Sequence, residues 1–347
     1  MHEPSDRRSG RAPTIVDVAT AAGFSVSTVS RVLRGGQDVN SMTRARIQEV
    51  MLELGFRPSP IARALVTGEW RLIALLVSDL TNPFYPQLAR SVELSARALG
   101  YTVIICNTDD DIDITVSSIE RLSRQGLDGI INASGRGQED ELLKVLLDPR
   151  RIVFANRRPS SDRFSSVVSD NESGAKELAR HLISLGHRHI GFIGGPSYAT
   201  NAMDRERGFQ EVIAEHPGAT AFVSRGPFGR QNGYRTVSSW LDQGFPISAV
   251  VGVNDTVAIG ALEAVLEHGL RVPEDISVAG FDNVDLATSA IFHLTTVSLD
   301  IERMGKLAVE LLISQLKAEG KFKPTSMVLT PRLVTRKTSG TPSNDPA

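Results

Sequence analysis

Three side chains near the amino terminus have types and spacing suited to reading the edges of DNA bases. Ser27 and Arg31 are four residues apart in "VSTVSRVL", residues 26–33, so a helix would carry them on one face beside Val26. Arginine binds guanine through two hydrogen bonds, serine bonds a base or a phosphate, and valine touches the methyl group of thymine. This pattern predicts contacts in the major groove of DNA.

The elements that would present these side chains are two short helical patterns within "TIVDVATAAGFSVSTVSRVLRG", residues 14–35. Gly23 permits a tight turn between the two patterns, and Ser25 caps the second helix by accepting a backbone N–H. The spacing predicts a helix-turn-helix, and the alternative is a helical hairpin with solvated arginines. The apolar positions that we expect to face inward are Val16, Val18, Ala19, Ala22, Val29 and Val32 or Leu33.

The distribution of charge agrees with a DNA-binding amino terminus. The chain of 347 residues has a net charge of −2, which argues against a protein that coats nucleic acid uniformly. The first 66 residues, however, contain nine arginines and six acidic residues. A third helical pattern, "SMTRARIQEVMLELG", has a packing face formed by Ile47, Val50, Met51 and Leu54.

The rest of the chain alternates short apolar runs with amphipathic helical stretches in two series. The first series contains "RLIALLVSDL", "YTVIICNTD" and "RIVFANR", and the second contains "HIGFIGG", "SAVVGVN" and "ISVAGFD". Apolar strands joined by helices imply parallel sheets that are covered on both faces. We therefore expect two Rossmann-like α/β lobes, with the helical stretch "IERMGKLAVELLISQLKAEG" docked on one of them.

Several phrases, taken together, give the chain a specific resemblance. They include "DVATAAGFSVSTVSRVL", "NPFY", "SDNESGA", "HLISLGHRHIGFIGG", "VNDTVAIGAL" and "VPEDISVAGFDN". From about residue 14 to residue 336 the sequence resembles the LacI/GalR family of bacterial transcription repressors, of which the lactose repressor is typical. The resemblance implies an all-α helix-turn-helix headpiece, a hinge helix, and a two-lobed core similar to periplasmic sugar-binding proteins. It also implies a homodimer bound to a pseudo-palindromic operator in double-stranded DNA.

The resemblance also sets the expected domain boundaries. We place a disordered start at residues 1–12, the headpiece at 13–58, the hinge at 59–69, the core at 70–338 and a disordered tail at 339–347. Within the core, residues 70–169 and 300–328 form the expected amino-terminal lobe. The expected carboxyl-terminal lobe comprises residues 170–299 and 329–338.

The resemblance assigns DNA contacts beyond the second helix. A leucine of the family's hinge helix inserts into the minor groove at the centre of the operator, and Leu65 in "ARALV" matches it. Ser59 stands where the family often has asparagine, which leaves the local phosphate contact open. The full predicted set is Thr14, Ser25, Val26, Ser27, Thr28, Ser30, Arg31, Arg34, Ser59, Ala62 and Leu65.

The resemblance implies an effector between the lobes of the core. Phe84, Tyr85 and Phe228 match aromatic positions suited to the apolar face of a sugar or a base. Arg205, Asn254 and Asp282 match polar ligand contacts, whose charge-assisted hydrogen bonds would hold neighbouring hydroxyl groups. Further candidates, for which a loop-capping role is the alternative, are Asp79, Asn132, Asn156 and Asn201.

Other chemistries find little support in the sequence. No nucleophile stands beside an oriented base, no metal-binding spacing is complete, and "GFIGGPS" is not a phosphate-binding loop, so we expect no enzyme, cofactor or metal. No apolar run is long enough to span a membrane, and we expect a cytoplasmic protein. A solute-binding receptor without a DNA role is the competing hypothesis.

The identity and effect of the effector stay open at this point. A carbohydrate is the expected class, with a nucleoside or another metabolite as alternatives. The sequence does not show whether the effector releases or promotes DNA binding. Since "KTSGTPSNDPA" lacks leucine heptads, it favours a dimer over a tetramer.

Overall fold

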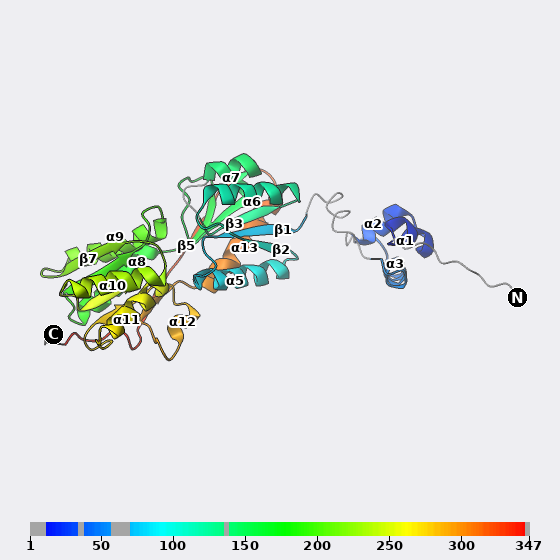
Figure 1. Cartoon of the computed structure of the whole chain (residues 1–347). Helices are drawn as coiled ribbons and strands as arrows, with labels where there is room; N and C mark the ends of the chain where they lie inside the picture. Colours follow the sequence, from blue (N-terminus) through cyan, green and yellow to red (C-terminus); the bar gives the residue numbers. More distant parts are fainter. Residues whose placement is uncertain (1–11, 34–37, 57–69, 135–138, 344–347) are drawn as a thin grey trace. The chain divides into compact units, whose positions relative to one another are not determined.

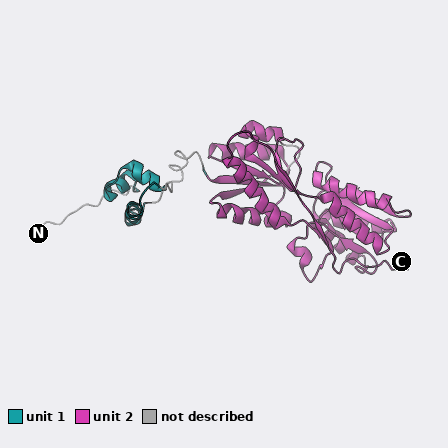
Figure 2. Cartoon of the chain, turned by 180° about the vertical axis from the view of Figure 1, so that it is seen from behind, with its two compact units in different colours: residues 1–70 teal, residues 71–347 magenta. Residues whose placement is uncertain are grey.

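The computed structural model describes residues 12–33, 38–56, 70–134 and 139–343. The chain divides into two compact units, residues 1–70 and residues 71–347 (Figures 1 and 2). No helix within the described ranges is both long enough and apolar enough to cross a membrane.

The first unit contains the predicted helix-turn-helix. Its helices are α1 Ile15–Ala22, α2 Val26–Leu33 and α3 Ser41–Glu53. Gly23 ends α1 in the left-handed conformation with φ of 75°, which a glycine adopts without strain. The Ser25 hydroxyl accepts the backbone N–H of Thr28 at 3.2 Å, so the predicted cap of α2 is confirmed. The small core that joins the three helices consists of Val18, Ala19, Val29, Val32, Ile47 and Val50.

The expected inward position of Val16 is wrong. Its side chain is 56% exposed, and Ile15 packs against the core instead. The reason is helical spacing, because Ile15, Val18, Ala19 and Ala22 follow the i, i+3, i+4, i+7 pattern of a single face, and Val16 lies outside it.

The N-lobe, residues 71–169 and 300–329, is built on parallel strands in the order β11-β5-β4-β3-β1-β2. Alternate residues of β1 face opposite sides of this sheet. Ile73 and Leu75 pack with α5 and α13, whereas Ala74 and Leu76 pack with α6 and α7, the two layers seen in Figure 1. The bounds are β1 Leu72–Val77, α5 Phe84–Ala98, β2 Thr102–Asn107, α6 Ile112–Arg124, β3 Gly129–Asn132, α7 Glu139–Leu146, η1 Pro149–Arg151, β4 Ile152–Ala155, β5 Ser165–Ser169, α13 Ile301–Lys317 and β11 Ser326–Leu329.

The C-lobe, residues 170–299 and 330–343, has parallel strands in the order β7-β6-β8-β9. Phe192 of β6 stacks on Phe209 of α9, whereas a Cβ atom added at Gly191 would meet Trp240 of α10, so helices cover both faces of the sheet. The bounds are α8 Asn171–Ser184, β6 His189–Gly194, α9 Thr200–Ala214, β7 Thr220–Arg225, α10 Arg230–Asp242, β8 Ala249–Gly252, α11 Asp255–Glu267, β9 Ser277–Ala279 and α12 Asp285–Thr288.

The chain crosses between the lobes near a short antiparallel pair. This pair consists of β10 Thr296–Ser298 and β12 Arg332–Val334. The segment after β10 leads into α13 of the N-lobe, and the segment after β11 leads back into β12. The fold class predicted from the sequence, a helical headpiece followed by a two-lobed core with parallel sheets, is therefore confirmed.

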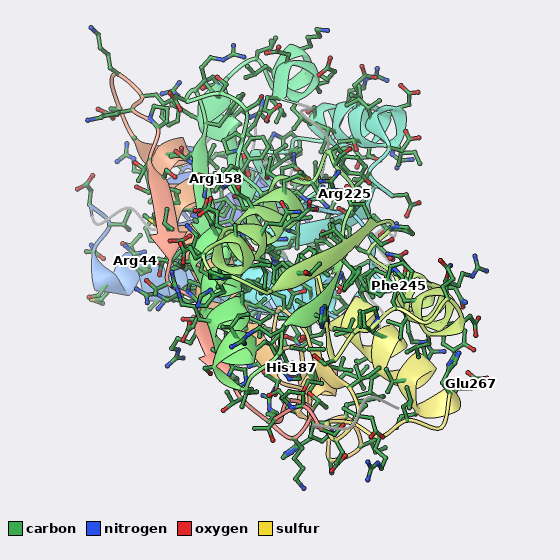
Figure 3. The ribbon with its side chains drawn as sticks, turned by 90° about the vertical axis from the view of Figure 1, so that its left-hand side faces the viewer. Arg44, Arg158, His187, Arg225, Phe245 and Glu267 are labelled. Carbon is green, nitrogen blue, oxygen red and sulfur yellow. The ribbon has the colours of Figure 1, made fainter. Side chains whose placement is uncertain are left out.

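The prediction of a disordered tail from residue 339 is wrong at its beginning. Ser339 and Gly340 are tied to the C-lobe, because His187 lies 2.9 Å from the Gly340 carbonyl and His181 lies 2.9 Å from the Ser339 hydroxyl. The backbone of Val278 also donates to the Thr338 carbonyl, so this segment covers the edge of β9. His187 lies well apart from Arg158 and Arg225 in Figure 3.

Candidate functional site

A pocket of about 310 Å³ lies between the N-lobe and the C-lobe. Its walls come from the segments that follow β1, β2, β6 and β7, where ligands bind in open parallel sheets because the carboxyl ends of the strands meet there. The residues that line it are Ser78, Asp79, Asn82, Tyr85, Asp109, Asp110, Pro196, Tyr198, Pro227, Phe228 and Gly229.

A buried ion pair supports the N-lobe side of this pocket. Nη1 of Arg157 lies 3.2 Å from Oδ1 of Asp110, and the two side chains are 4% and 9% exposed. Ser78 donates to the same carboxylate oxygen at 2.6 Å, and Tyr85 donates to Ser78 at 3.1 Å. Burial opposes the charge of Arg157, but Tyr85 and Asp110 outweigh it and raise the pKa of the guanidinium. This pair and Ser78 hold the Asp110 carboxylate at the pocket wall.

Two polar contacts join the lobes beside the pocket, in addition to the Arg157 guanidinium, which lies 6.0 Å from the centroid of the Phe228 ring. The Tyr198 hydroxyl of the C-lobe donates to Oδ2 of Asp110 at 3.2 Å. Arg158, labelled in Figure 3, lies 3.4 Å from Asp204 of α9, although its side chain is half exposed. The first contact is the stronger constraint, because an exposed ion pair contributes only about 0 to 1 kcal/mol.

The predicted effector residues divide into groups. Asp79, Tyr85 and Phe228 line the pocket, as the effector hypothesis requires. Phe84 is 2% exposed and packs edge-to-face on Tyr85 in the N-lobe core, with ring centroids 5.2 Å apart. Phe84 therefore supports the pocket wall from behind.

Arg205 and Asp282 meet each other in the interior of the C-lobe. Nη2 of Arg205 lies 3.0 Å from Oδ1 of Asp282, and the guanidinium lies 4.0 Å from the centroid of the Phe281 ring. Arg205 also donates to Asn171 at 2.8 Å and to the Val253 carbonyl at 2.7 Å. The hydrogen bonds of this guanidinium are thus made within the protein.

A second carboxylate, Asp255, is buried near this pair. Its Oδ2 accepts the backbone N–H of Val284 at 2.9 Å, and its Oδ1 accepts the Thr296 hydroxyl. Burial and the negative charge of Asp282 raise the pKa of Asp255 to about 8. Burial also raises the pKa of Asp282 to about 6, although the charge of Arg205 opposes this shift. Both carboxylates, Asp255 and Asp282, therefore exchange a proton closer to neutral pH than an ordinary aspartate does.

Most of the remaining asparagine candidates accept a hydrogen bond from a backbone N–H group. Asn254 accepts the N–H of Val257 at 2.8 Å and caps α11. Asn132 accepts the N–H of Ser134 at 3.0 Å, and Asn201 accepts the N–H of Ala202 at 3.0 Å. Asn156 adopts a left-handed φ of 67°, and its buried side-chain oxygen has no hydrogen-bond partner among the described residues. The buried Nδ2 of Asn132 has no hydrogen-bond partner among the described residues, and Asn201 lies within the first turn of α9, so contact of these asparagines with an effector stays a prediction.

The side chains predicted to read DNA lie on the exposed side of α2. Val26 is 42% exposed, and Ser27 and Arg31 are also exposed, whereas Val29 and Val32 are buried. The Ser25 hydroxyl lies 2.7 Å from that of Ser27 and 2.9 Å from that of Thr28, which groups three polar hydroxyls at the start of α2.

Three further points complete the DNA-contact predictions. Ser30 is half-buried, so only part of its side chain can reach DNA. Thr14 and Asp17 form a reciprocal capping box at α1. Arg34, Ser59, Ala62 and Leu65, together with the expected hinge helix, lie outside the described residues.

Comparison with known proteins decides the family. Residues 14–59 match bacterial regulatory proteins of the lacI family, and residues 179–339 match a periplasmic binding protein-like domain. The transcriptional regulator DegA of Bacillus subtilis (strain 168) is 34% identical over 328 residues, which cover 93% of this chain and 97% of DegA. The chain belongs to the LacI family of bacterial regulatory proteins.

Other comparisons agree with this assignment over nearly the whole chain. The ribose operon repressor of Halalkalibacterium halodurans is 34% identical over 306 residues, which cover 88% of this LacI-family chain and 90% of that repressor. The lac repressor dimer bound to operator and the anti-inducer ONPF has the same fold, with a TM-score of 0.83 and 26% identity over 95% of this chain and 100% of the other. The family match at residues 14–59 overturns the hypothesis of a receptor without a DNA role.

Sequence reasoning missed most of the pocket lining in this LacI-family protein, including Asp109. It also missed the connected polar group formed by Ser78, Asp110, Arg157 and Tyr198. A signal existed for Asp110 and Arg157, because each follows an apolar strand, in "YTVIICNTDD" and "RIVFANR", and the carboxyl ends of parallel strands bear the ligand sites. The loop that carries Tyr198 has no comparable pattern.

Proposed function

We propose that this LacI-family regulator is a homodimeric repressor whose affinity for a pseudo-palindromic operator is switched by a carbohydrate bound between the lobes. It acts in the cytoplasm, by binding and not by catalysis. The observation that carries the proposal is the pocket bridged by Tyr198 and Asp110, because a ligand there touches both lobes at once.

The chemistry of the pocket suits a sugar better than a nucleobase. Asp79 and Asp109 supply carboxylate acceptors for hydroxyl groups, and Phe228 supplies an aromatic face for the apolar side of a sugar ring. The ribose operon repressor among the relatives supports the same class by its name.

The switch follows from differential binding to two lobe arrangements. A ligand that contacts both lobes stabilises the arrangement in which these contacts form, and it shifts the population toward that arrangement. We propose that this arrangement is unfavourable for two headpieces on one operator, so that the effector releases DNA. As the family resemblance implies, we further propose that Leu65 inserts into the minor groove of the operator when the dimer is bound to it.

The test is selection of binding sites from fragmented genomic DNA by the purified full-length chain. We expect enrichment of a pseudo-palindrome, which Arg31→Ala weakens through the major groove and Leu65→Ala weakens through the minor groove. Adding the cognate sugar should then lower the operator affinity. If no sequence is enriched, either alone or with pooled sugars and nucleosides, the regulator mechanism is wrong. If a sugar strengthens operator binding, the release mechanism is wrong.

A further inference from the structure

A second pocket of about 290 Å³ adjoins the first. The two pockets share Asp79 and Asn82 of the N-lobe and Phe228 and Gly229 of the C-lobe. The second extends from this shared wall toward α11 and α12, where its own lining consists of Thr81, Pro83, Arg230, Thr256, Ile259 and Leu286. The cleft is therefore longer than the effector pocket of the proposed function.

The two pockets differ in chemistry. The first contains the carboxylates of Asp109 and Asp110 and the phenols of Tyr85 and Tyr198. The second is lined mainly by apolar groups and threonine hydroxyls, and the charge of its Arg230 is compensated by Glu263 at 3.0 Å. The first pocket suits a ring with many hydroxyl groups, and the second suits a less polar group.

The charge of the first pocket restricts the ligand further. Asp79, Asp109 and Asp110 line it, and the buried cation beside it, Arg157, is paired with Asp110. The lining therefore remains negative, which disfavours a phosphorylated or carboxylated ligand through repulsion between like charges.

The size of the cleft indicates a ligand of two parts. Each pocket by itself lies near the lower end of the range of roughly 300 to 1,000 Å³ that small-molecule sites occupy. A ligand that fills both pockets passes between Asp79 and Phe228, which lie on the wall common to both.

We propose that the effector is an uncharged glycoside with two ring-sized parts. Its hydroxyl-rich sugar occupies the first pocket, and the second sugar or the apolar aglycon occupies the pocket of Thr256, Ile259 and Leu286. This inference rests on the proposed carbohydrate effector. The second pocket makes Leu286 and Thr256 determinants of specificity without a role in holding the first sugar.

The test compares matched ligands on the full-length chain by calorimetry. Each common monosaccharide is paired with its disaccharides, its phenyl glycoside and its 6-phosphate. We expect one glycoside series to bind at least tenfold more tightly than its free monosaccharide, and the corresponding sugar phosphate to bind at least tenfold more weakly. Leu286→Trp should remove the advantage of the glycoside by filling the second pocket, and should leave binding of the monosaccharide unchanged.

Matched variants separate this effect from damage to the fold. Leu286 is 45% exposed, so a larger side chain is tolerated there, and Ile291→Trp is the control because Ile291 is 87% exposed and outside both pockets. Thr256→Phe fills the second pocket from the side of α11 and should give the same result as Leu286→Trp. If monosaccharides bind as tightly as their glycosides, or if Leu286→Trp preserves the advantage, the second pocket is wrongly assigned while the carbohydrate effector stands. If nucleosides bind and no sugar does, both proposals are wrong.

Discussion

The phenol of Tyr198 donates a 3.2 Å hydrogen bond to the carboxylate of Asp110 and so connects the C-lobe to the N-lobe at the wall of the pocket. The same carboxylate is held by Ser78 and Arg157 within the N-lobe. The Asp110 carboxylate is held within the N-lobe and the Tyr198 phenol belongs to the C-lobe, so this hydrogen bond forms only when the two lobes lie close together.

We predict that Tyr198→Phe weakens effector binding by about tenfold. A hydrogen bond to a charged group contributes about 1.5 to 3 kcal/mol, and part of this is lost to water in a half-buried position. The measurement is effector titration by calorimetry. Tyr234→Phe is the matched control, because Tyr234 donates to Glu267 at 2.6 Å within the C-lobe alone. Equal dissociation constants for the two variants would show that the bond does not favour the bound arrangement.

We predict that Arg31→Ala and Val29→Ala impair operator binding in different ways. Arg31 is exposed, so its removal costs about 1 to 3 kcal/mol of discrimination at one base pair and spares the fold of the headpiece. Val29 is fully buried, so its truncation costs about 2 kcal/mol of headpiece stability and weakens binding to all sequences. Titration of the selected operator and of its single-base variants checks this, and a uniform loss of affinity in Arg31→Ala would contradict it.

We predict that Asp255 makes the core less stable as pH rises from about 4 to about 8. The pKa of Asp255 is raised from 3.8 to about 8, first by burial and then by Asp282, so the folded state keeps a proton that the unfolded state has lost. The free energy of unfolding then falls with pH by at most about 1.4 kcal/mol per pH unit.

The measurement is urea unfolding of the wild type and Asp255→Asn at pH 5 and pH 8. The neutral amide should gain stability relative to the wild type at pH 8, where the carboxylate must ionise in the interior. A difference between the two proteins that is the same at both pH values would refute the assignment.

We predict that His187 changes stability with pH in the opposite direction, so that its contribution to the free energy of unfolding rises with pH. Burial lowers the pKa of this imidazole from 6.5. The hydrogen bond with the Gly340 carbonyl opposes this shift and the charges of His181 and Arg188 add to it, so the folded state favours the neutral form. Its contribution to stability is complete above pH 6.5 and is lost as pH falls through the lowered pKa. The Gly340 carbonyl accepts a hydrogen bond from this imidazole and favours its charged form, so the loss of stability comes from burial of the charge, and the free energy of unfolding should fall as His187 becomes charged.

Urea unfolding at pH 7.5 and pH 5.5 measures this effect. Between these two pH values His187→Gln should lose less stability than the wild type. His268→Gln is the control, because hydrogen bonds with Ala264 and Asp242 raise the pKa of that exposed imidazole. A loss of stability in acid that is as large in His187→Gln as in the wild type would count against the role of His187.

The sequence by itself determined the helix-turn-helix and the parallel lobes, because these depend on local spacing. Gly23 at the turn, Ser25 at the cap and the i, i+3 spacing of Val29 and Val32 act within a few residues of each other. The candidate pocket residues were also within reach, Asp79 at the end of an apolar run and Tyr85 and Phe228 through the family resemblance.

Only the tertiary structure decided the partners of these side chains. Asp110 meets Arg157 across 47 residues and Tyr198 across 88 residues of sequence. Arg205 and Asp282, both predicted to contact the effector, form an ion pair with each other across 77 residues of sequence (282 − 205), and their contact with an effector stays a prediction. The physical reason is that strand order and lobe packing fix such distances, and both arise from long-range burial of apolar surface that no local pattern encodes.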